Sequence, residues 1–193
     1  RRLGADYETV KRINPRIISC SITSFGHDAP DAEVPAFDLV LQALGGGMGI
    51  TGEPGRTPVR MGLPIADLAG GMFGAVAVCA ALFRRERTGD GTRIYLSLLD
   101  CQASLLTYMA QFFFINGEVP GPQGSGHVAV VPYQAFRTKD SFVVVAVFVE
   151  KFWKALCEAL ERTDLFEDER FSNNELRVRH RDDLVPLIEE TFR

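Results

Sequence analysis

The longest apolar stretch of the chain runs from Leu68 to Phe83 and contains no charged residue. Pro64 cannot continue a helix from the preceding segment, and Asp67 is a preferred N-cap or first-turn residue. Arg84–Arg87 and Gly89 follow, where cations suit the negative end of the helix dipole and glycine suits a left-handed cap. This pattern predicts a buried helix that begins near Asp67. Its density of glycine and alanine indicates a core helix and not a membrane span.

Shorter patterns predict elements on both sides of this helix. Before it, the patterns predict a helix over 6–12, a buried strand of parallel type over 17–22 and a helix over 36–44. After it, they predict a strand over 92–97, a second long buried helix over 98–115 and a hairpin whose second strand covers 142–149. The last two elements are an amphipathic helix over 150–160 that buries Phe152, Trp153, Leu156 and Leu160, and a helical segment over 174–192 whose charges form a solvated face. The order of elements predicts an α/β fold. Residues 117–126, rich in Gly and Pro, are predicted to link two regions.

Composition narrows the class of protein. The 193 residues carry a net charge of −4 with a pI near 5.4, which argues against a nucleic-acid surface. Four widely spaced cysteines form no CxxC pair, so we expect reduced thiols, no zinc site and a cytoplasmic location. His27 and His180 have no metal-like partners, and no metal site is predicted. The chain lacks an initiating Met and ends within a helical pattern, which indicates a piece of a longer protein.

Three features of the sequence allow a chemical interpretation. A carboxylate at the position of Asp67 is usually a helix cap, but the first-turn N–H groups could also support an ionised nucleophile and a neighbouring oxyanion. Residues 47–52 match GxGxxG, yet a helix precedes them and a Pro-rich loop follows, so we reject a dinucleotide site there. Gly126 and His127 lie in a predicted loop that could face a substrate, although a single histidine is more often structural.

Six segments together resemble the family III CoA-transferases, the formyl-CoA transferase and carnitine CoA-transferase group. These segments are NPRIISCSITSFG, PAFDLVLQALGG, TGEPGRTPVRMGLPIADLAGG, ALFRRERTGDGTRIYLSLLD, VPYQAFRTKDSFVVVAV and DERFSNNELRVRHRDDL. They follow the family order along nearly the whole chain. The resemblance implies that residues 1–116 are part of a Rossmann-like large CoA-binding domain, with the nucleophile helix, and that 127–193 begin a smaller α+β domain.

The same resemblance implies site residues and partners. Asp67 would be the nucleophile that carries aspartyl anhydride and aspartyl-CoA thioester intermediates. CoA would be the cosubstrate, with an acyl-CoA and a free carboxylic acid as substrates and with no metal or redox nucleotide. Residues matched to CoA contacts are Arg2, Pro35, Ala36, Phe37 and Asp38. Without the resemblance, Phe37 would equally well be a core residue and Asp38 a helix start.

Two alternatives remain open from the sequence. The related α-methylacyl-CoA racemases look alike but place a histidine where Phe37 stands, and phenylalanine cannot exchange a proton. The chain could also be a CoA-binding or dimerisation module without turnover, with its sheet edge and apolar helices exposed. The family resemblance implies an interlocked homodimer for the full-length protein. The acyl donor and the acceptor acid are not specified by the sequence.

Overall fold

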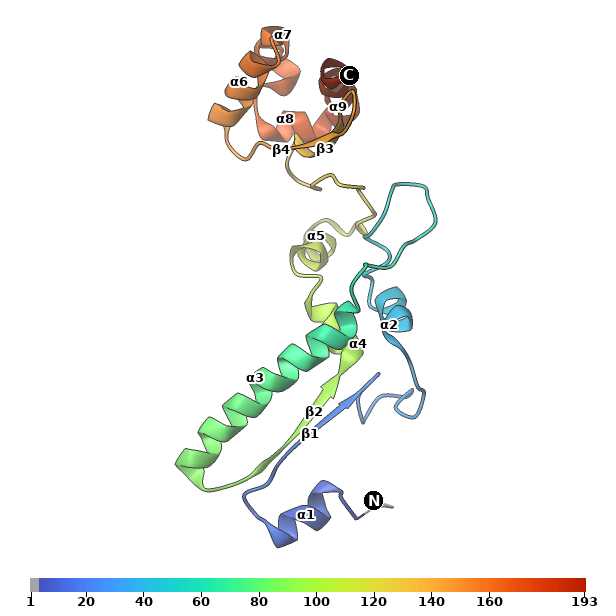
Figure 1. The fold of residues 1–193 in the computed structure, drawn as a ribbon, viewed down its shortest axis with the longest axis vertical. Coiled ribbons are helices and arrows are strands. Elements are labelled where there is room, and N and C mark those ends of the chain that lie inside the picture. Colours follow the sequence, from blue (N-terminus) through green and yellow to red (C-terminus); the bar gives the residue numbers. More distant parts are fainter. Residues whose placement is uncertain (1–3) are drawn as a thin grey trace. The chain divides into compact units, whose positions relative to one another are not determined.

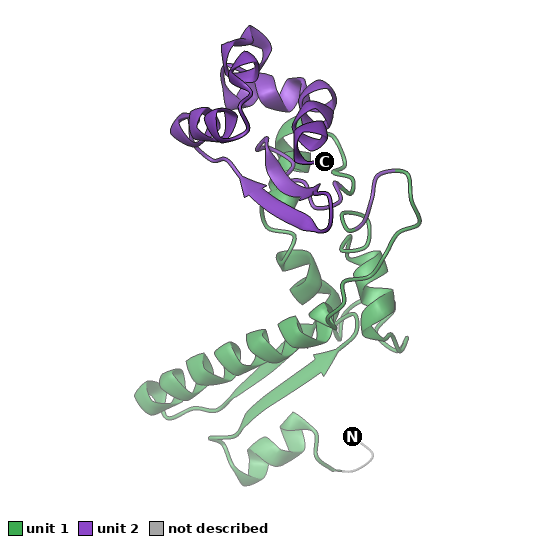
Figure 2. Ribbon diagram, turned by 45° about the horizontal axis from the view of Figure 1, so that its top comes forward, with its two compact units in different colours: residues 1–51, 55–122 green, residues 52–54, 123–193 purple. Residues whose placement is uncertain are grey.

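The computed structural model describes residues 4–193 and divides them into two compact units, each a mixture of helices and a small sheet (Figure 2). The first unit contains the residues up to Thr51 together with Gly55–Pro122. The second contains Gly52–Pro54 together with Gln123–Arg193. The mixed α/β class predicted from the sequence is confirmed. The assignment of the two regions to a CoA-binding domain and a small domain stays a prediction.

A parallel pair of strands and a long helix form the first unit (Figure 1). Its elements are α1 Tyr7–Ile13, β1 Ile18–Thr23, α2 Asp38–Leu44, α3 Ile65–Thr88, β2 Thr92–Ser97, α4 Leu98–Ser104 and α5 Tyr108–Asn116. β1 pairs with β2 from Ile18 opposite Thr92 to Thr23 opposite Ser97. The predicted parallel strand and both helices on its flanks are present, with bounds shifted by one or two residues. The prediction that the strand is buried is wrong within this chain, because no residue of β1 is fully buried and Ile22 is 44% exposed.

α3 lies along one face of this strand pair because glycines let it approach closely (Figure 1). A Cβ at Gly74 would come within 3.3 Å of Ile22 Cδ1 and 3.5 Å of Leu96 Cδ1, and one at Gly70 would strike the Leu98 side chain. Gly89 ends the helix with φ 79°, as its position predicted.

The prediction that α3 is buried is right for only one side of the helix. Ala66, Ala69, Gly70, Gly74 and Ala81 are its buried residues. The opposite side exposes the large apolar side chains Leu68, Met72, Phe73, Val76, Leu82 and Phe83. By length and composition alone the 24-residue helix could cross a membrane. Within this chain it packs one face on a sheet and leaves the other uncovered.

The second long buried helix predicted over 98–115 is wrong. The structure breaks it into α4 and α5, whose axes differ by 74°. Thr107 adopts φ 48° just before α5, a conformation that interrupts a right-handed helix. α5 has no buried residue, so its apolar character does not reflect burial within this chain. The continuous apolar pattern contains no glycine or proline that would have marked the break.

The second unit packs helices against an antiparallel hairpin. Its elements are β3 Tyr133–Arg137, β4 Phe142–Ala146, α6 Glu150–Ala159, α7 Thr163–Glu167, the 3-10 helix η1 Glu169–Phe171, α8 Asn174–Arg179 and α9 Arg181–Phe192. The hairpin is confirmed, with Tyr133 opposite Ala146 and Arg137 opposite Phe142. The core of this unit is built from Val131, Phe136, Val145, Val147, Trp153, Cys157, Leu165, Phe171, Leu184 and Ile188.

Two sequence predictions in this unit need correction. Phe152 was expected on the buried face of α6, but its side chain is 52% exposed, and Trp153 and Cys157 are the buried pair instead. The charges over 174–192 were expected to be solvated, but Arg177 is fully buried. The guanidinium of Arg177 is paired with the Glu150 carboxylate at 2.8 Å and lies over the Trp153 ring, which offsets the cost of burying its charge.

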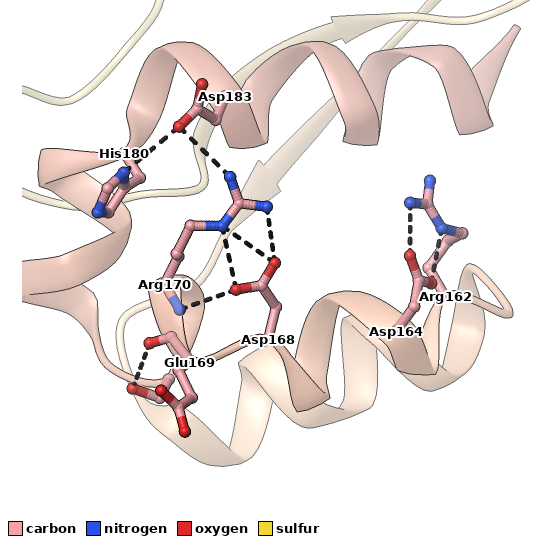
Figure 3. A network of polar contacts seen from close by, with 8 residues as sticks. Arg162, Asp164, Asp168, Glu169, Arg170, His180 and Asp183 are labelled. Carbon is pink, nitrogen blue, oxygen red and sulfur yellow. Dashed lines mark hydrogen bonds and ion pairs between the residues drawn. The ribbon is translucent and has the colours of Figure 1, made fainter.

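A polar network fixes the start of α9 to the η1 turn (Figure 3). Arg170 donates to Asp168 at 2.7 Å and lies 3.7 Å from Asp183, which also contacts His180 at 3.3 Å. The Arg170 hydrogen bond is the main reason that the pKa of Asp168 is held below its usual range. The first turn of α9, with Arg181, is thus tied to its neighbours by side chains.

Candidate functional site

Asp67 lies in the first turn of α3 and its side chain is exposed. The helix follows Pro64, whose side chain cannot accept a hydrogen bond, and the first helical bond runs from the Leu68 N–H to the Pro64 carbonyl at 3.0 Å. N–H groups of the first turn have no partner inside a helix, and they give this end a partial positive charge. A carboxylate here is therefore in a favourable field while remaining open to solvent.

The capping role expected of such a carboxylate is filled by another residue. Asp38, the first residue of α2, accepts a hydrogen bond from the Ala66 N–H at 2.9 Å. Its second carboxylate oxygen accepts from the Gln42 amide at 2.7 Å. Within residues 4–193, Asp67 makes no comparable hydrogen bond. The bland interpretation of Asp67 as the helix cap is therefore wrong, and Asp38 combines the predicted helix start with a cap 28 residues away.

Buried Gln42 fixes the chain that leads into α3. Its amide oxygen accepts from the Met61 N–H at 2.8 Å, and its amide nitrogen donates to the Leu63 carbonyl at 3.1 Å as well as to Asp38. The Asp38 and Gln42 side chains together hold the backbone at Met61, Leu63 and Ala66, on both sides of the start of α3. Sequence reasoning missed Gln42, because an amide one turn after an aspartate carries no recognisable signal.

The predicted CoA loop leads directly from the end of β1 into α2. Ser24 Oγ donates to the Ala36 carbonyl at 3.2 Å and accepts from the Ala36 N–H at 3.1 Å, which fixes this loop to the strand end. Phe37 is 85% exposed, so core packing is excluded for it within this chain. Pro35 is exposed beside it. Arg2, the remaining residue predicted to contact CoA, lies outside the described residues.

Glycines beside α2 accommodate a buried amide and not a nucleotide. A Cβ at Gly45 would come 2.5 Å from Gln102 Cγ, and one at Gly47 would come 2.7 Å from Gln102 Nε2. The glycine-rich residues 45–52 follow α2, and no helix begins directly after them. The GxGxxG match over 47–52 therefore has a helix before it and a loop after it, as the sequence predicted. Gln102 Oε1 is buried without a hydrogen-bond partner in the described part of the chain.

The other face of the strand pair is polar, which the alternation of β1 and β2 could have indicated. Ser21, His27, Arg93 and Tyr95 line a cavity of about 580 Å³ there, together with Tyr7 of α1. Ser21 Oγ lies 2.8 Å from His27 Nε2, and the Arg93 guanidinium lies over the Tyr95 ring at 4.2 Å. His27 is thus a hydrogen-bonded side chain, and residues 4–193 contain no cluster of His, Cys, Asp or Glu suited to a metal.

Gly126 and His127 belong to an irregular segment of the second unit. His127 Nδ1 accepts from the Ala129 N–H at 3.0 Å, so the neutral ring carries its proton on Nε2. The ring also packs against Tyr133, with centroids 5.3 Å apart. A Cβ at Gly126 would come 3.1 Å from Arg181 Nη1, which explains the glycine. Whether this segment faces a substrate stays a prediction.

A mixed α/β fold with a carboxylate at the mouth of its longest helix agrees with the comparison with known proteins. Residues 1–193 match CoA-transferase family III over their whole length, and the chain belongs to this family. A crystal structure of a CAIB/BAIF family protein from Brucella suis is similar in fold, with a TM-score of 0.84 and 38% identity, over 99% of this chain and 50% of that one.

Curated relatives of the chain are named as CoA-transferases. A succinate–glutarate CoA-transferase from Agrobacterium fabrum is 35% identical over 97% of this chain and 47% of its own length. A succinyl-CoA:mesaconate CoA-transferase from Haloarcula marismortui is 39% identical over 85% of this chain and 42% of its own length. The chain therefore spans about half the length of the curated relatives it matches.

Proposed function

We propose that the full-length protein transfers CoA from an acyl-CoA to a free carboxylic acid, with Asp67 as the nucleophile. The observation that carries the proposal is the exposed Asp67 carboxylate in the first turn of α3, freed from capping by Asp38 in a chain of family III. The helix dipole and the first-turn N–H groups favour a negative charge that develops beside this carboxylate during the reaction.

The first half of the reaction removes CoA from the donor. A carboxylate oxygen of Asp67 attacks the thioester carbonyl, the C–S bond breaks, and a mixed anhydride and CoA thiolate form. The thiolate is a competent leaving group because the pKa of a thiol is about 8.5. It then attacks the aspartyl carbonyl of the anhydride, which releases the donor acid as a carboxylate and leaves an aspartyl-CoA thioester.

The second half repeats these steps with the acceptor acid. The acceptor carboxylate attacks the aspartyl-CoA carbonyl, which gives a new mixed anhydride and CoA thiolate. Attack of the thiolate on the acceptor's own acyl carbon then forms the product acyl-CoA and restores the Asp67 carboxylate. Each step exchanges one activated acyl bond for another, so the cycle requires no external energy source.

A short-chain dicarboxylic acid is the acceptor class that the relatives favour. Their names specify succinate and glutarate, mesaconate, and oxalate as acids that those proteins use. We propose succinyl-CoA as the first donor to test, because it occurs in the names of relatives from several organisms. A screen of short dicarboxylic acids against succinyl-CoA in the full-length protein identifies the acceptor through the new CoA ester formed.

The decisive experiment is Asp67→Asn in the full-length protein. Asparagine keeps the shape of the side chain but cannot form an anhydride or a thioester, so turnover should fall by several orders of magnitude. In the wild type, hydroxylamine added after acyl-CoA should leave a hydroxamate on the peptide that contains Asp67. An Asp67→Asn enzyme that keeps its activity, with deamidation excluded by mass spectrometry, would refute the mechanism.

The same assay separates the alternative functions. Movement of label from a free acid into a CoA ester supports transfer. Epimerisation at the α-carbon without such movement would support a racemase, for which exposed Phe37 provides no proton-transfer group. CoA binding with neither reaction would support a module without turnover.

A further inference from the structure

Three side chains from α8 and the start of α9 hold an irregular segment by its backbone. Residues 123–131 contain turns but no helix or strand. The carbonyls of residues 127, 128, 129 and 131 all accept hydrogen bonds from Asn174, Arg177 or Arg181. Asn174 and Arg177 are three positions apart on α8, a spacing that places side chains on one helical face, and Arg181 is the first residue of α9 after the break at His180.

Each contact fixes a different part of the segment. Asn174 donates to the Ala129 carbonyl at 2.9 Å and accepts from the Val131 N–H at 3.1 Å. Arg177 donates to the Val131 carbonyl at 2.8 Å from a fully buried position. Because both side chains bind the backbone of residues 129–131, these residues have little freedom to change their dihedral angles.

Arg181 holds the part of the segment that precedes these contacts. Its Nη2 donates to the His127 carbonyl at 2.5 Å and to the Val128 carbonyl at 3.2 Å, and Nη1 reaches Gln123 Oε1 at 3.5 Å. No carboxylate within residues 4–193 forms an ion pair with it. Desolvation by burial lowers the pKa of Arg181, so this cation is withdrawn from water in favour of backbone carbonyls.

Gly126 is the residue that permits this arrangement. A Cβ at this position would come 2.9 Å from the Gln123 carbonyl oxygen and 3.1 Å from Arg181 Nη1. A Cβ here would therefore require the Gln123 carbonyl or the guanidinium to shift by a few tenths of an ångström, and glycine avoids that shift. The segment and Arg181 are fitted to one another at the two residues that the sequence singled out, Gly126 and His127.

We propose that Arg181 is a positioning residue for the transfer reaction: together with Asn174 and Arg177 it holds residues 123–131, including Gly126 and His127, in the one conformation that supports turnover. The proposal rests on the proposed function. Two arginines and an asparagine hydrogen-bond the backbone of this irregular segment and fix its conformation. Loops that a rigid scaffold holds in this way commonly carry functional residues. Arg181 itself does not touch the reacting atoms.

The test compares Arg181→Met with Arg179→Met in the full-length protein. Arg179 lies on α8 and pairs only with Glu175 at 3.1 Å in the described chain, so it is a matched control. In Arg181→Met, we expect amide exchange in 123–131 to accelerate about tenfold or more, because charge-assisted hydrogen bonds are lost. The kcat of transfer should fall by a similar factor, while the dissociation constant of CoA stays within about twofold.

Two further variants make the result specific. Arg181→Lys should restore part of kcat, because an ammonium can still donate to one carbonyl. Gly126→Ala should also accelerate exchange in 123–131, by disturbing the Gln123 turn and the position of the guanidinium, with a smaller loss of kcat than Arg181→Met. Wild-type kcat in Arg181→Met, or an equal loss in Arg179→Met, would overturn the proposal. A wild-type protein without transfer activity would instead refute the proposed function and the positioning role with it, while exchange would still report whether Arg181 holds the segment.

Discussion

The two carboxylates at the mouth of α3 should respond to mutation in opposite ways. Asp38 holds the helix and should govern stability, whereas exposed Asp67 should govern turnover. Asp38→Ala removes the cap on the Ala66 N–H, which costs about 0.5–2 kcal/mol. It also removes one partner of the buried Gln42 amide, a loss of about 1 kcal/mol because the Leu63 carbonyl remains as an acceptor.

Together these losses give about 1.5–3 kcal/mol for Asp38→Ala. Asp38→Asn should cost only about 1 kcal/mol, because asparagine still caps Ala66 and only the bond to Gln42 is lost. The Gln42 amide cannot flip to restore that bond without giving up its contact with the Met61 N–H. Asp67→Asn should change the free energy of unfolding by less than about 0.5 kcal/mol, as expected of an exposed side chain.

The assay is hydrogen exchange at the first turn of α3, combined with thermal unfolding of the full-length protein. Exchange of the Ala66 amide should be faster in Asp38→Ala than in Asp38→Asn, and unchanged in Asp67→Asn. Binding of CoA distinguishes the role that the sequence predicted for Asp38: a direct contact would lower CoA affinity in Asp38→Asn even though the fold is kept. Wild-type stability in Asp38→Ala would refute the structural role assigned to this residue.

Two further predictions concern the second unit. The hydrogen bond with Arg177 is the main reason that the pKa of Glu150 is lowered in the folded protein. The Glu150–Arg177 pair therefore stabilises the fold above about pH 4.3, the ordinary pKa of a glutamate, and this stabilisation is lost as the pH falls through the lower pKa of Glu150 in the folded state. The Glu150 side chain is 53% exposed, so solvent screening weakens the pair, and Glu150→Gln should cost about 0.5–1 kcal/mol at neutral pH. The substitution should also weaken this acid dependence in urea titrations, and an unchanged profile would exclude the pair as its source. Burial raises the pKa of Cys157 to about 11, so this thiol is protonated at pH 8. Iodoacetamide at pH 8 should therefore label exposed Cys20 and Cys79 but not Cys157 until the chain unfolds. Labelling of Cys157 at the same rate as Cys20 and Cys79 would contradict its burial.

The sequence predicted best those elements whose ends carry chemical signals. Pro64 and Gly89 bracket α3 within one residue of its observed limits, and the Gly89–Gly91 turn leads into β2 as predicted. Helix capping and turn preferences act within a few residues, so they can be recognised without knowing the fold. The break at Thr107 has no such signal, and the apolar pattern continued through it.

Contacts between distant residues could not be predicted in the same way. The Asp38 cap joins residues 28 apart, and the Glu150 pair with Arg177 joins residues 27 apart. Arg177 looked like one of many surface cations, because its burial depends on contacts with Glu150 and Trp153 of α6, which are distant in the sequence. For Asp67, local sequence rules predicted a helix cap. In the structure Asp38, which is distant in the sequence, caps the helix instead.

The assignment of Gly52–Pro54 to the second unit has a consequence for how this protein can be divided. The Gly124 N–H donates a hydrogen bond to the Gly52 carbonyl at 2.8 Å. Three residues from the first half of the chain, Gly52–Pro54, therefore belong to the second unit. The polypeptide therefore passes between the units at 51/52, 54/55 and 122/123. A single recombination event within 117–123 would take Gly124 and its partner Gly52 from different parents. Homologous halves exchanged there would therefore have to match at residues 52–54 as well.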